Sequence, residues 1–151
     1  MNNAVDQTLF MRATRGEQTE RTPVWLMRQA GRTDPAYLQL RENVGLPLED
    51  LFRHAELAAK ISLLPRRFGV DAIIYYQDIL TPLTPMGAHF VFRPGPVLTQ
   101  PIARVKDLDR LVNFDMASEL PFIAETFERV QQELRGELPV LGFAGAPLTL
   151  A

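Results

Sequence analysis

Three short apolar runs predict buried strands. They span residues 24–27, 71–76 and 138–143, and their apolar side chains are continuous rather than alternating. Continuous runs of this length are typical of strands buried on both faces, as in a parallel sheet. In the intervening stretches 49–64 and 118–135, apolar side chains recur at helical spacing. Strands that alternate with helices predict βαβ units and an α/β fold with a parallel sheet.

Shorter elements are predicted around this framework. Short helices are expected over 8–16, around 37–41 and over 107–111. The segment 89–93 has the aromatic and β-branched content of a strand and lies in a Pro- and Gly-rich stretch, which predicts a small hairpin. Ser118 has the side chain of a good N-cap and is expected to begin the long helix that follows it.

Polar side chains follow two of the predicted strands at the point where each strand ends. The residues after the first strand are Arg28, Gln29, Ala30, Gly31 and Arg32. Asp78 follows the second strand. Because the carboxyl ends of parallel strands meet at one edge of a sheet, we expect both segments to share a cleft. The first segment could bind an anion, and Asp78 could accept N–H hydrogen bonds or stabilise a cation. Structural ion pairs explain these residues equally well, either between Asp78 and the arginines or between the arginines and acids at a barrel rim.

Charge and composition narrow the classes of ligand. The 151 residues carry a formal net charge of −2, which gives no bulk attraction to nucleic acid or to an anionic membrane. All but two of the 16 basic residues are arginines, whose planar guanidinium binds carboxylates bidentately. The excess of arginine indicates a carboxylate-rich ligand, and an arginine bias of the genome explains it equally well.

The sequence predicts neither a metal site nor a disulfide. The chain has no cysteine, which excludes disulfides, thiolate nucleophiles and Cys-ligated metals within it. His54 and His89 have no partner at ligand spacing, so both are expected to be structural or solvent-facing, with His54 on an exposed helix face. The amino terminus lacks a signal-peptide pattern, and no run of about 18 apolar residues occurs. The expected location is therefore the cytoplasm, with no membrane association.

Two longer motifs resemble the signatures of a known family. Residues 23–32 read Pro-Val-Trp-Leu-Met-Arg-Gln-Ala-Gly-Arg, and residues 142–150 read Gly-Phe-Ala-Gly-Ala-Pro-Leu-Thr-Leu. Between them, the segment 68–74 and the following 78–80 are similar to the strand that delivers an active-site aspartate in that family. Over nearly its whole length, the chain thus resembles the uroporphyrinogen decarboxylase family. The first motif is far more specific than a lone pair of arginines.

This resemblance implies a fold and a reaction. The family fold is a (β/α)8 TIM barrel, and about 250 residues are typical of an eight-stranded α/β barrel. Residues 1–151 are therefore expected to form its amino-terminal part, about three βα units without an internal domain boundary. The family reaction removes carbon dioxide from the four acetate side chains of uroporphyrinogen III and gives coproporphyrinogen III for haem biosynthesis, without a metal or organic cofactor. The family's active-site tyrosine and histidine correspond to positions beyond Ala151. The full-length protein is expected to be a homodimer.

The resemblance also implies roles for individual residues. In the family, the loop that matches residues 28–32 binds substrate carboxylates, and Arg41 matches a further substrate-facing arginine. The aspartate that matches Asp78 accepts hydrogen bonds from pyrrole N–H groups and stabilises a cationic pyrrole. The chain departs from the family pattern at three places: Tyr76 and Gln77 instead of Phe and Ser, Leu148 instead of Trp, and Thr33 and Asp34 where a Tyr is usual.

Two alternatives to an active decarboxylase stay open. The first is a corrinoid-linked zinc methyltransferase of the same fold, whose relatives are not expected to share the Arg-Gln-Ala-Gly-Arg loop. A zinc assay on the complete protein separates this alternative from the decarboxylase. The second alternative is an inactive, truncated fragment that binds a tetrapyrrole weakly or not at all.

Overall fold

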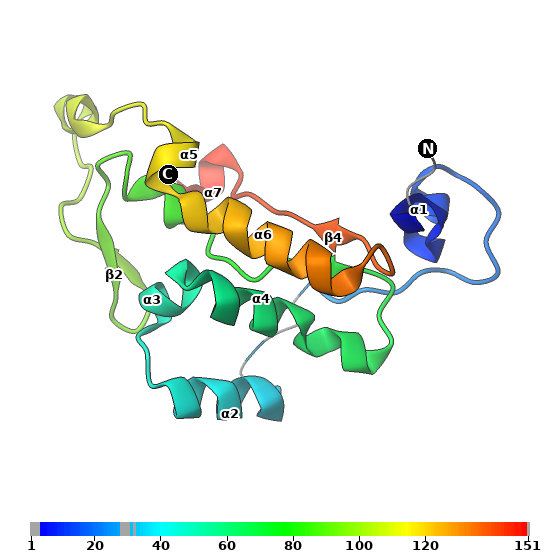
Figure 1. Ribbon diagram of the computed structural model, residues 1–151. Helices are drawn as coiled ribbons and strands as arrows, with labels where there is room; N and C mark the ends of the chain where they lie inside the picture. Colours follow the sequence, from blue (N-terminus) through cyan, green and yellow to red (C-terminus); the bar gives the residue numbers. More distant parts are fainter. Residues whose placement is uncertain (1–3, 28–30, 32, 151) are drawn as a thin grey trace.

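The computed structural model describes residues 4–27, 31 and 33–150. Two helices, α4 (Ala55–Leu63) and α6 (Pro121–Leu134), lie side by side through the middle of the molecule (Figure 1). A β-hairpin lies toward one end of this pair, and the amino-terminal helix α1 (Leu9–Thr14) lies beyond the other end. The structure is therefore a mixed α/β arrangement built around two packed helices.

A pair of short parallel strands lies beside these helices. β1 (Ile73–Ile74) pairs with β4 (Val140–Leu141) in the parallel direction. The pairing extends beyond β1, since the Tyr75 N–H donates to the Leu141 carbonyl at 3.0 Å. The connection between the strands includes α6, as a βαβ unit requires. The parallel pairing predicted from the second and third apolar runs is confirmed.

The strand predicted over 24–27 is wrong. No strand is assigned there, and Leu26 and Met27 are 52% and 74% exposed. Two hydrogen bonds tie the start of the run to the residues before β1: the Asp71 N–H donates to the Val24 carbonyl at 2.8 Å, and the Val24 N–H donates to Asp71 Oδ2 at 2.6 Å. A continuous apolar run becomes a buried strand only where both faces are covered, and within the described chain Leu26 and Met27 lack that cover.

The helix predicted over 49–64 is two helices. α3 (Leu48–Arg53) ends at His54, whose backbone is extended with ψ of 94°, and α4 follows directly. His54 caps α4, because its Nδ1 accepts a hydrogen bond from the Leu57 N–H at 3.5 Å. A side chain that satisfies a backbone N–H ahead of it favours a helix start over a helix interior. The expected exposure of His54 is confirmed.

The helix predicted over 118–135 is also divided. α5 (Met116–Glu119) precedes α6, and Leu120 between them has φ of −130° and ψ of 47°. Proline at position 121 disfavours a helical backbone at the residue before it, which accounts for the break. Ser118 is not the N-cap, because it lies inside α5 and donates its own N–H to the capping side chain of Asp115 at 3.0 Å.

The core lies where α4 and α6 meet the strand pair. Ile73 of β1 is fully buried and belongs to one cluster with Ala59 of α4 and Val130 and Leu134 of α6. A second cluster packs α2 (Pro35–Val44) against α3 and α4 through Tyr37, Leu51 and Ile61. The two clusters fix the position of the segment that leaves β1 at its carboxyl end.

The short helices and the hairpin are confirmed. The helix predicted over 8–16 is α1, and the one around 37–41 is the longer α2. The hairpin consists of β2 (Phe90–Phe92) and β3 (Pro96–Leu98) in antiparallel pairing. The helix predicted over 107–111 is a 3-10 helix at Val105–Arg110. The other short elements of the described chain are 3-10 helices at Ala4–Gln7, Leu64–Phe68 and Thr81–Leu83 and the single turn α7 at Pro147–Leu150. Among the described residues, no helix combines the length and apolarity needed to cross a membrane.

Candidate active site

Asp78 lies in the turn that follows β1. The turn is organised by Gln77, whose Oε1 accepts hydrogen bonds from the Asp78 N–H at 2.9 Å and from Thr81 Oγ1 at 3.1 Å. A further backbone bond joins the Thr81 N–H to the Asp78 carbonyl at 3.3 Å. The Asp78 side chain is half-buried and lines a cavity. The prediction that a carboxylate stands at the carboxyl end of the second strand is thus confirmed in position.

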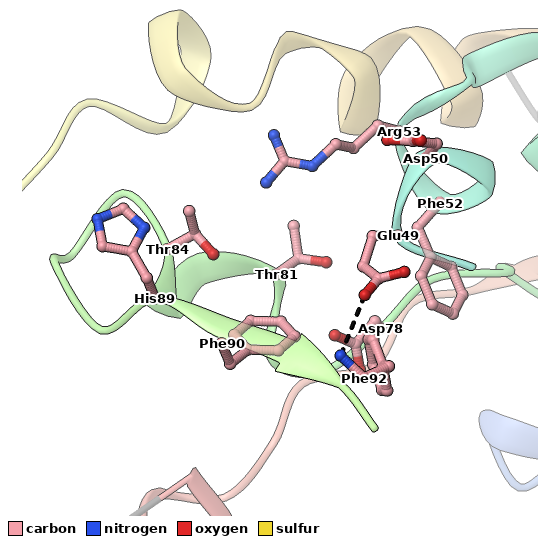
Figure 2. Close-up of a pocket in the computed structure, with 10 residues that line it drawn as sticks. All are labelled: Glu49, Asp50, Phe52, Arg53, Asp78, Thr81, Thr84, His89, Phe90 and Phe92. Carbon is pink, nitrogen blue, oxygen red and sulfur yellow. Dashed lines mark hydrogen bonds between the residues drawn. The ribbon is translucent and has the colours of Figure 1, made fainter. Parts of the chain in front are cut away.

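The cavity beside Asp78 has a volume of about 290 Å³ and lies between α3 and the β2–β3 hairpin (Figure 2). Three segments that are distant in sequence line it: α3, the turn after β1, and the hairpin with the residue before it. The lining residues are Glu49, Asp50, Phe52, Arg53, Asp78, Thr81, Thr84, His89, Phe90 and Phe92. Of these, the sequence predicted a functional role for Asp78 alone.

The surroundings of Asp78 disfavour its ionised form. Burial is the main cause and raises the pKa of the Asp78 carboxyl above its ordinary value. The backbone N–H groups of Leu80 and Ile79 act in the opposite direction, and the negative charge of Glu49 raises the pKa further. A cation or a polarised N–H donor placed next to Asp78 would offset both the burial and the repulsion.

Arg41 does not line the cavity that contains Asp78. Its guanidinium stands over the Tyr37 ring, 5.9 Å from the ring centre. The Tyr37 hydroxyl shares a hydrogen bond of 2.9 Å with the hydroxyl of Tyr76, the residue two positions before Asp78. Burial and this bond raise the pKa of Tyr76, which stays a neutral phenol. The structure therefore places Arg41 on α2, in contact with Tyr37, which is hydrogen-bonded in turn to Tyr76 in the segment that leads to Asp78.

Most of the predicted anion-binding segment lies outside the described residues. This applies to Arg28, Gln29, Ala30 and Arg32, and also to any ion pair between either arginine and Asp78. Gly31 is described: its carbonyl accepts a hydrogen bond from the Asp34 N–H at 2.9 Å. This bond joins Gly31 to the residue that caps α2.

Asp34, one of the departures from the family pattern, stabilises the start of α2. Its buried carboxylate caps α2 by accepting a hydrogen bond from the Ala36 N–H at 2.9 Å. The same carboxylate forms an ion pair with Arg67, which follows α4. Asp34 thereby joins the end of the 28–34 segment to the helical layer.

Comparison with a solved structure identifies the fold and not the family. The structure matches a methyltransferase from Methanosarcina mazei with a TM-score of 0.72, covering 95% of this chain and 44% of that protein. The sequences of the two proteins are 21% identical, so the likeness shows a shared fold alone.

Comparison of sequences identifies the family, which the shared fold alone does not. The family model for Uroporphyrinogen decarboxylase (URO-D) matches residues 6–151. The uroporphyrinogen decarboxylase of Geotalea uraniireducens (strain Rf4) is 43% identical over 145 residues, which cover 95% of this chain and 42% of the relative. That of Bacillus subtilis (strain 168) is 41% identical over 145 residues, with coverages of 94% and 40%. The chain belongs to the uroporphyrinogen decarboxylase family, and it spans about two fifths of the length of these curated relatives.

Proposed function

We propose that this chain supplies the amino-terminal part of a uroporphyrinogen decarboxylase, folded as the first portion of a (β/α)8 barrel. The observation that carries the proposal is the position of Asp78, which follows a parallel strand and lines a cavity. Catalytic side chains of such barrels come from the carboxyl ends of the strands. Family membership supplies the reaction, the conversion of uroporphyrinogen III to coproporphyrinogen III by loss of carbon dioxide from four acetate side chains.

In this proposal Asp78 acts by stabilising charge. Protonation of a pyrrole ring carbon gives a cationic ring, and the electron pair of the breaking C–C bond flows into that ring as carbon dioxide leaves. A carboxylate that accepts hydrogen bonds from the pyrrole N–H groups stabilises this cationic ring more than it stabilises the neutral pyrrole ring of the ground state. Because burial raises the pKa of Asp78, acid is expected to abolish this effect at a higher pH than it would for an exposed aspartate.

Arginines hold the substrate carboxylates in this proposal. Arg28 and Arg32 are assigned to substrate together with the backbone of the residues between them, where small side chains let a ligand approach. Arg41 is a third candidate, because its guanidinium stands over the Tyr37 ring and a guanidinium held in this way can bind a carboxylate through its N–H edges. The proposed reaction uses no metal or organic cofactor, and the family-length protein is proposed to be a homodimer.

Two measurements test the proposal. The chain itself is titrated with uroporphyrinogen III under anaerobic conditions, and saturable binding is expected. Turnover is measured in a chimera in which this chain replaces the matched segment of the Bacillus subtilis relative, which is 41% identical. Coproporphyrinogen III is quantified by chromatography after oxidation to the porphyrin.

Asp78→Asn is the decisive variant in the chimera. We expect kcat to fall about 100-fold or more, the usual effect of removing one group that stabilises a transition-state charge. The Kd for substrate is expected to change far less, because the neutral ground state gains less from the carboxylate. Asp109→Asn is the matched control, since Asp109 is an exposed carboxylate in the 3-10 helix at Val105–Arg110. Unchanged turnover in Asp78→Asn, or equal losses of kcat and affinity, contradicts the role of Asp78.

A further inference from the structure

We propose that Glu49 is a positioning residue for the Asp78 site: it fastens the β2–β3 hairpin to α3 and places a second negative charge beside Asp78. The inference rests on the proposed function, because it concerns the same cavity. In this inference the Glu49 side chain both attaches the wall of the cavity and contributes a negative charge close to the Asp78 carboxylate.

The attachment is a hydrogen bond between segments distant in sequence. Glu49 Oε1 accepts a hydrogen bond from the Phe92 N–H at 3.1 Å (Figure 2). Across the hairpin, the Arg93 N–H donates to the Gly95 carbonyl at 2.8 Å. Because successive N–H groups of a strand point to opposite sides, the Phe92 N–H points away from β3, at the outer edge of the hairpin. Glu49 therefore satisfies an edge N–H that the hairpin cannot satisfy itself.

The attached strand carries the aromatic wall of the cavity. Phe90 and Phe92 lie on the same face of β2, with ring centres 5.6 Å apart and an edge-to-face angle of 82°. Both rings line the cavity that contains Asp78. The flat faces of single pyrrole rings, such as those of a porphyrinogen, find matching surface on aromatic side chains. Fixing the Phe92 backbone to α3 thus holds this aromatic wall against the α3 side of the cavity that Asp78 also lines.

The carboxylate of Glu49 is directed toward both Phe92 and Asp78 (Figure 2). The other charged or titratable side chains of the cavity are Asp50 and Arg53 on α3 and His89 before β2. Tyr76 lies outside this lining and interacts electrostatically with Asp78. Arg53 extends toward the side of the cavity that holds Thr84 and His89 (Figure 2). The negative charge of Glu49 raises the pKa of Asp78. Glu49 therefore acts on the Asp78 site through its charge as well as through its hydrogen bond to Phe92.

The test uses two substitutions of Glu49 and one control in the protein itself. Glu49→Gln keeps an oxygen that accepts the Phe92 N–H bond and removes the charge. Glu49→Ala removes the bond and the charge. Asp50→Asn removes a neighbouring charge in the same cavity. Carbon-detected NMR titration follows the pKa of the Asp78 carboxyl, and amide hydrogen exchange follows the protection of the Phe92 N–H.

The two measurements separate the two roles. Glu49→Gln is expected to lower the pKa of Asp78 and to keep the Phe92 amide protected. Glu49→Ala is expected to lower the pKa of Asp78 and to reduce the protection of Phe92 about tenfold, as the loss of one hydrogen bond to a charged group implies. Asp50→Asn is expected to leave the Phe92 amide protected and to move the pKa of Asp78 less than either Glu49 variant.

Two results overturn the inference. The electrostatic role is refuted if Glu49→Gln leaves the pKa of Asp78 in place, and the attachment is refuted if Glu49→Ala leaves the Phe92 amide fully protected. Glu49→Gln is nearly isosteric, so it keeps the test decisive if Glu49→Ala fails to fold. Neither measurement involves substrate, so a failure here is distinct from a failure to bind or decarboxylate uroporphyrinogen III.

Discussion

Replacing Ile73 or Leu26 with alanine compares a fully buried apolar side chain with one in the exposed run 24–27. Ile73 is 0% exposed in β1 and packs against α4 and α6. Leu26 is 52% exposed. Removing a buried isoleucine side chain costs about 2–5 kcal/mol, and the helices on its face cannot both relax into the space, so we expect about 3–4 kcal/mol for Ile73→Ala. Full burial of a leucine contributes about 1.5–3 kcal/mol, so half-burial without a cavity predicts about 1 kcal/mol for Leu26→Ala.

Urea denaturation followed by far-ultraviolet circular dichroism measures both costs. The slope of the free energy of unfolding against urea concentration should be the same in both variants and the parent, so that the midpoints report stability. Ile73→Val is a graded control, with an expected cost of about 0.5–1.5 kcal/mol. If Leu26→Ala costs as much as Ile73→Ala, the run 24–27 is a buried strand, and the arrangement described for it is refuted.

Two other predictions concern hydrogen bonds between distant segments. Tyr37→Phe leaves the half-buried hydroxyl of Tyr76 without its partner, so we expect urea denaturation to show a loss of about 1–2 kcal/mol in the free energy of unfolding. The double variant with Tyr76→Phe should lose less than the sum of the two single variants, and additive losses would contradict the pairing. Arg21 holds the pKa of Asp71 below its ordinary value, so the stabilisation by Asp71 is present above its unfolded-state pKa and is lost as the pH falls through its lower folded-state pKa. Asp71→Asn should flatten the acid limb of a stability–pH profile, and an unchanged limb would rule out this linkage.

The helices and the parallel strand pair could be predicted because their signals are local. The apolar spacing of α6 and the short run around Ile73 depend only on nearby residues. The run 24–27 has the same kind of signal and is exposed at Leu26 and Met27. Apolar character is a property of the segment, whereas burial also depends on what packs against it. Sequence pattern alone could not separate these two cases.

The predicted helix boundaries were wrong for a different reason. At His54 and at Leu120, one residue leaves the helical backbone while the apolar spacing continues on both sides. The break at Leu120 has a local signal, because a proline follows it. The break at His54 depends on an imidazole nitrogen that accepts a backbone N–H, a use of histidine that spacing does not reveal. A proline after a predicted start is therefore a better guide to a helix boundary than a single candidate cap such as Ser118.

The candidate site shows where sequence reasoning ends. Asp78 could be predicted because a carboxylate at the end of a buried strand is a recognisable signal. Glu49 and Phe92 could not, because their contact arises only when the hairpin folds back onto α3. The predicted hairpin did imply an outer edge with unpaired N–H groups that needs acceptors. No sequence signal singles out Glu49 as that acceptor, and its contact with the Phe92 N–H is seen only in the structure.

The choice of Glu49 has a consequence for the proposed chemistry. Glu49 accepts the Phe92 N–H bond and carries a negative charge that repels Asp78. The attachment of the hairpin through Glu49 therefore disfavours ionisation of the Asp78 carboxyl. A cation placed beside both carboxylates removes that repulsion, whereas a neutral ring does so far less. If the substrate ring becomes cationic in the transition state, Glu49 and Asp78 together favour the transition state over the ground state more strongly than Asp78 does alone. The repulsion that makes Asp78 harder to ionise in the free protein is then relieved in the transition state of the reaction we propose.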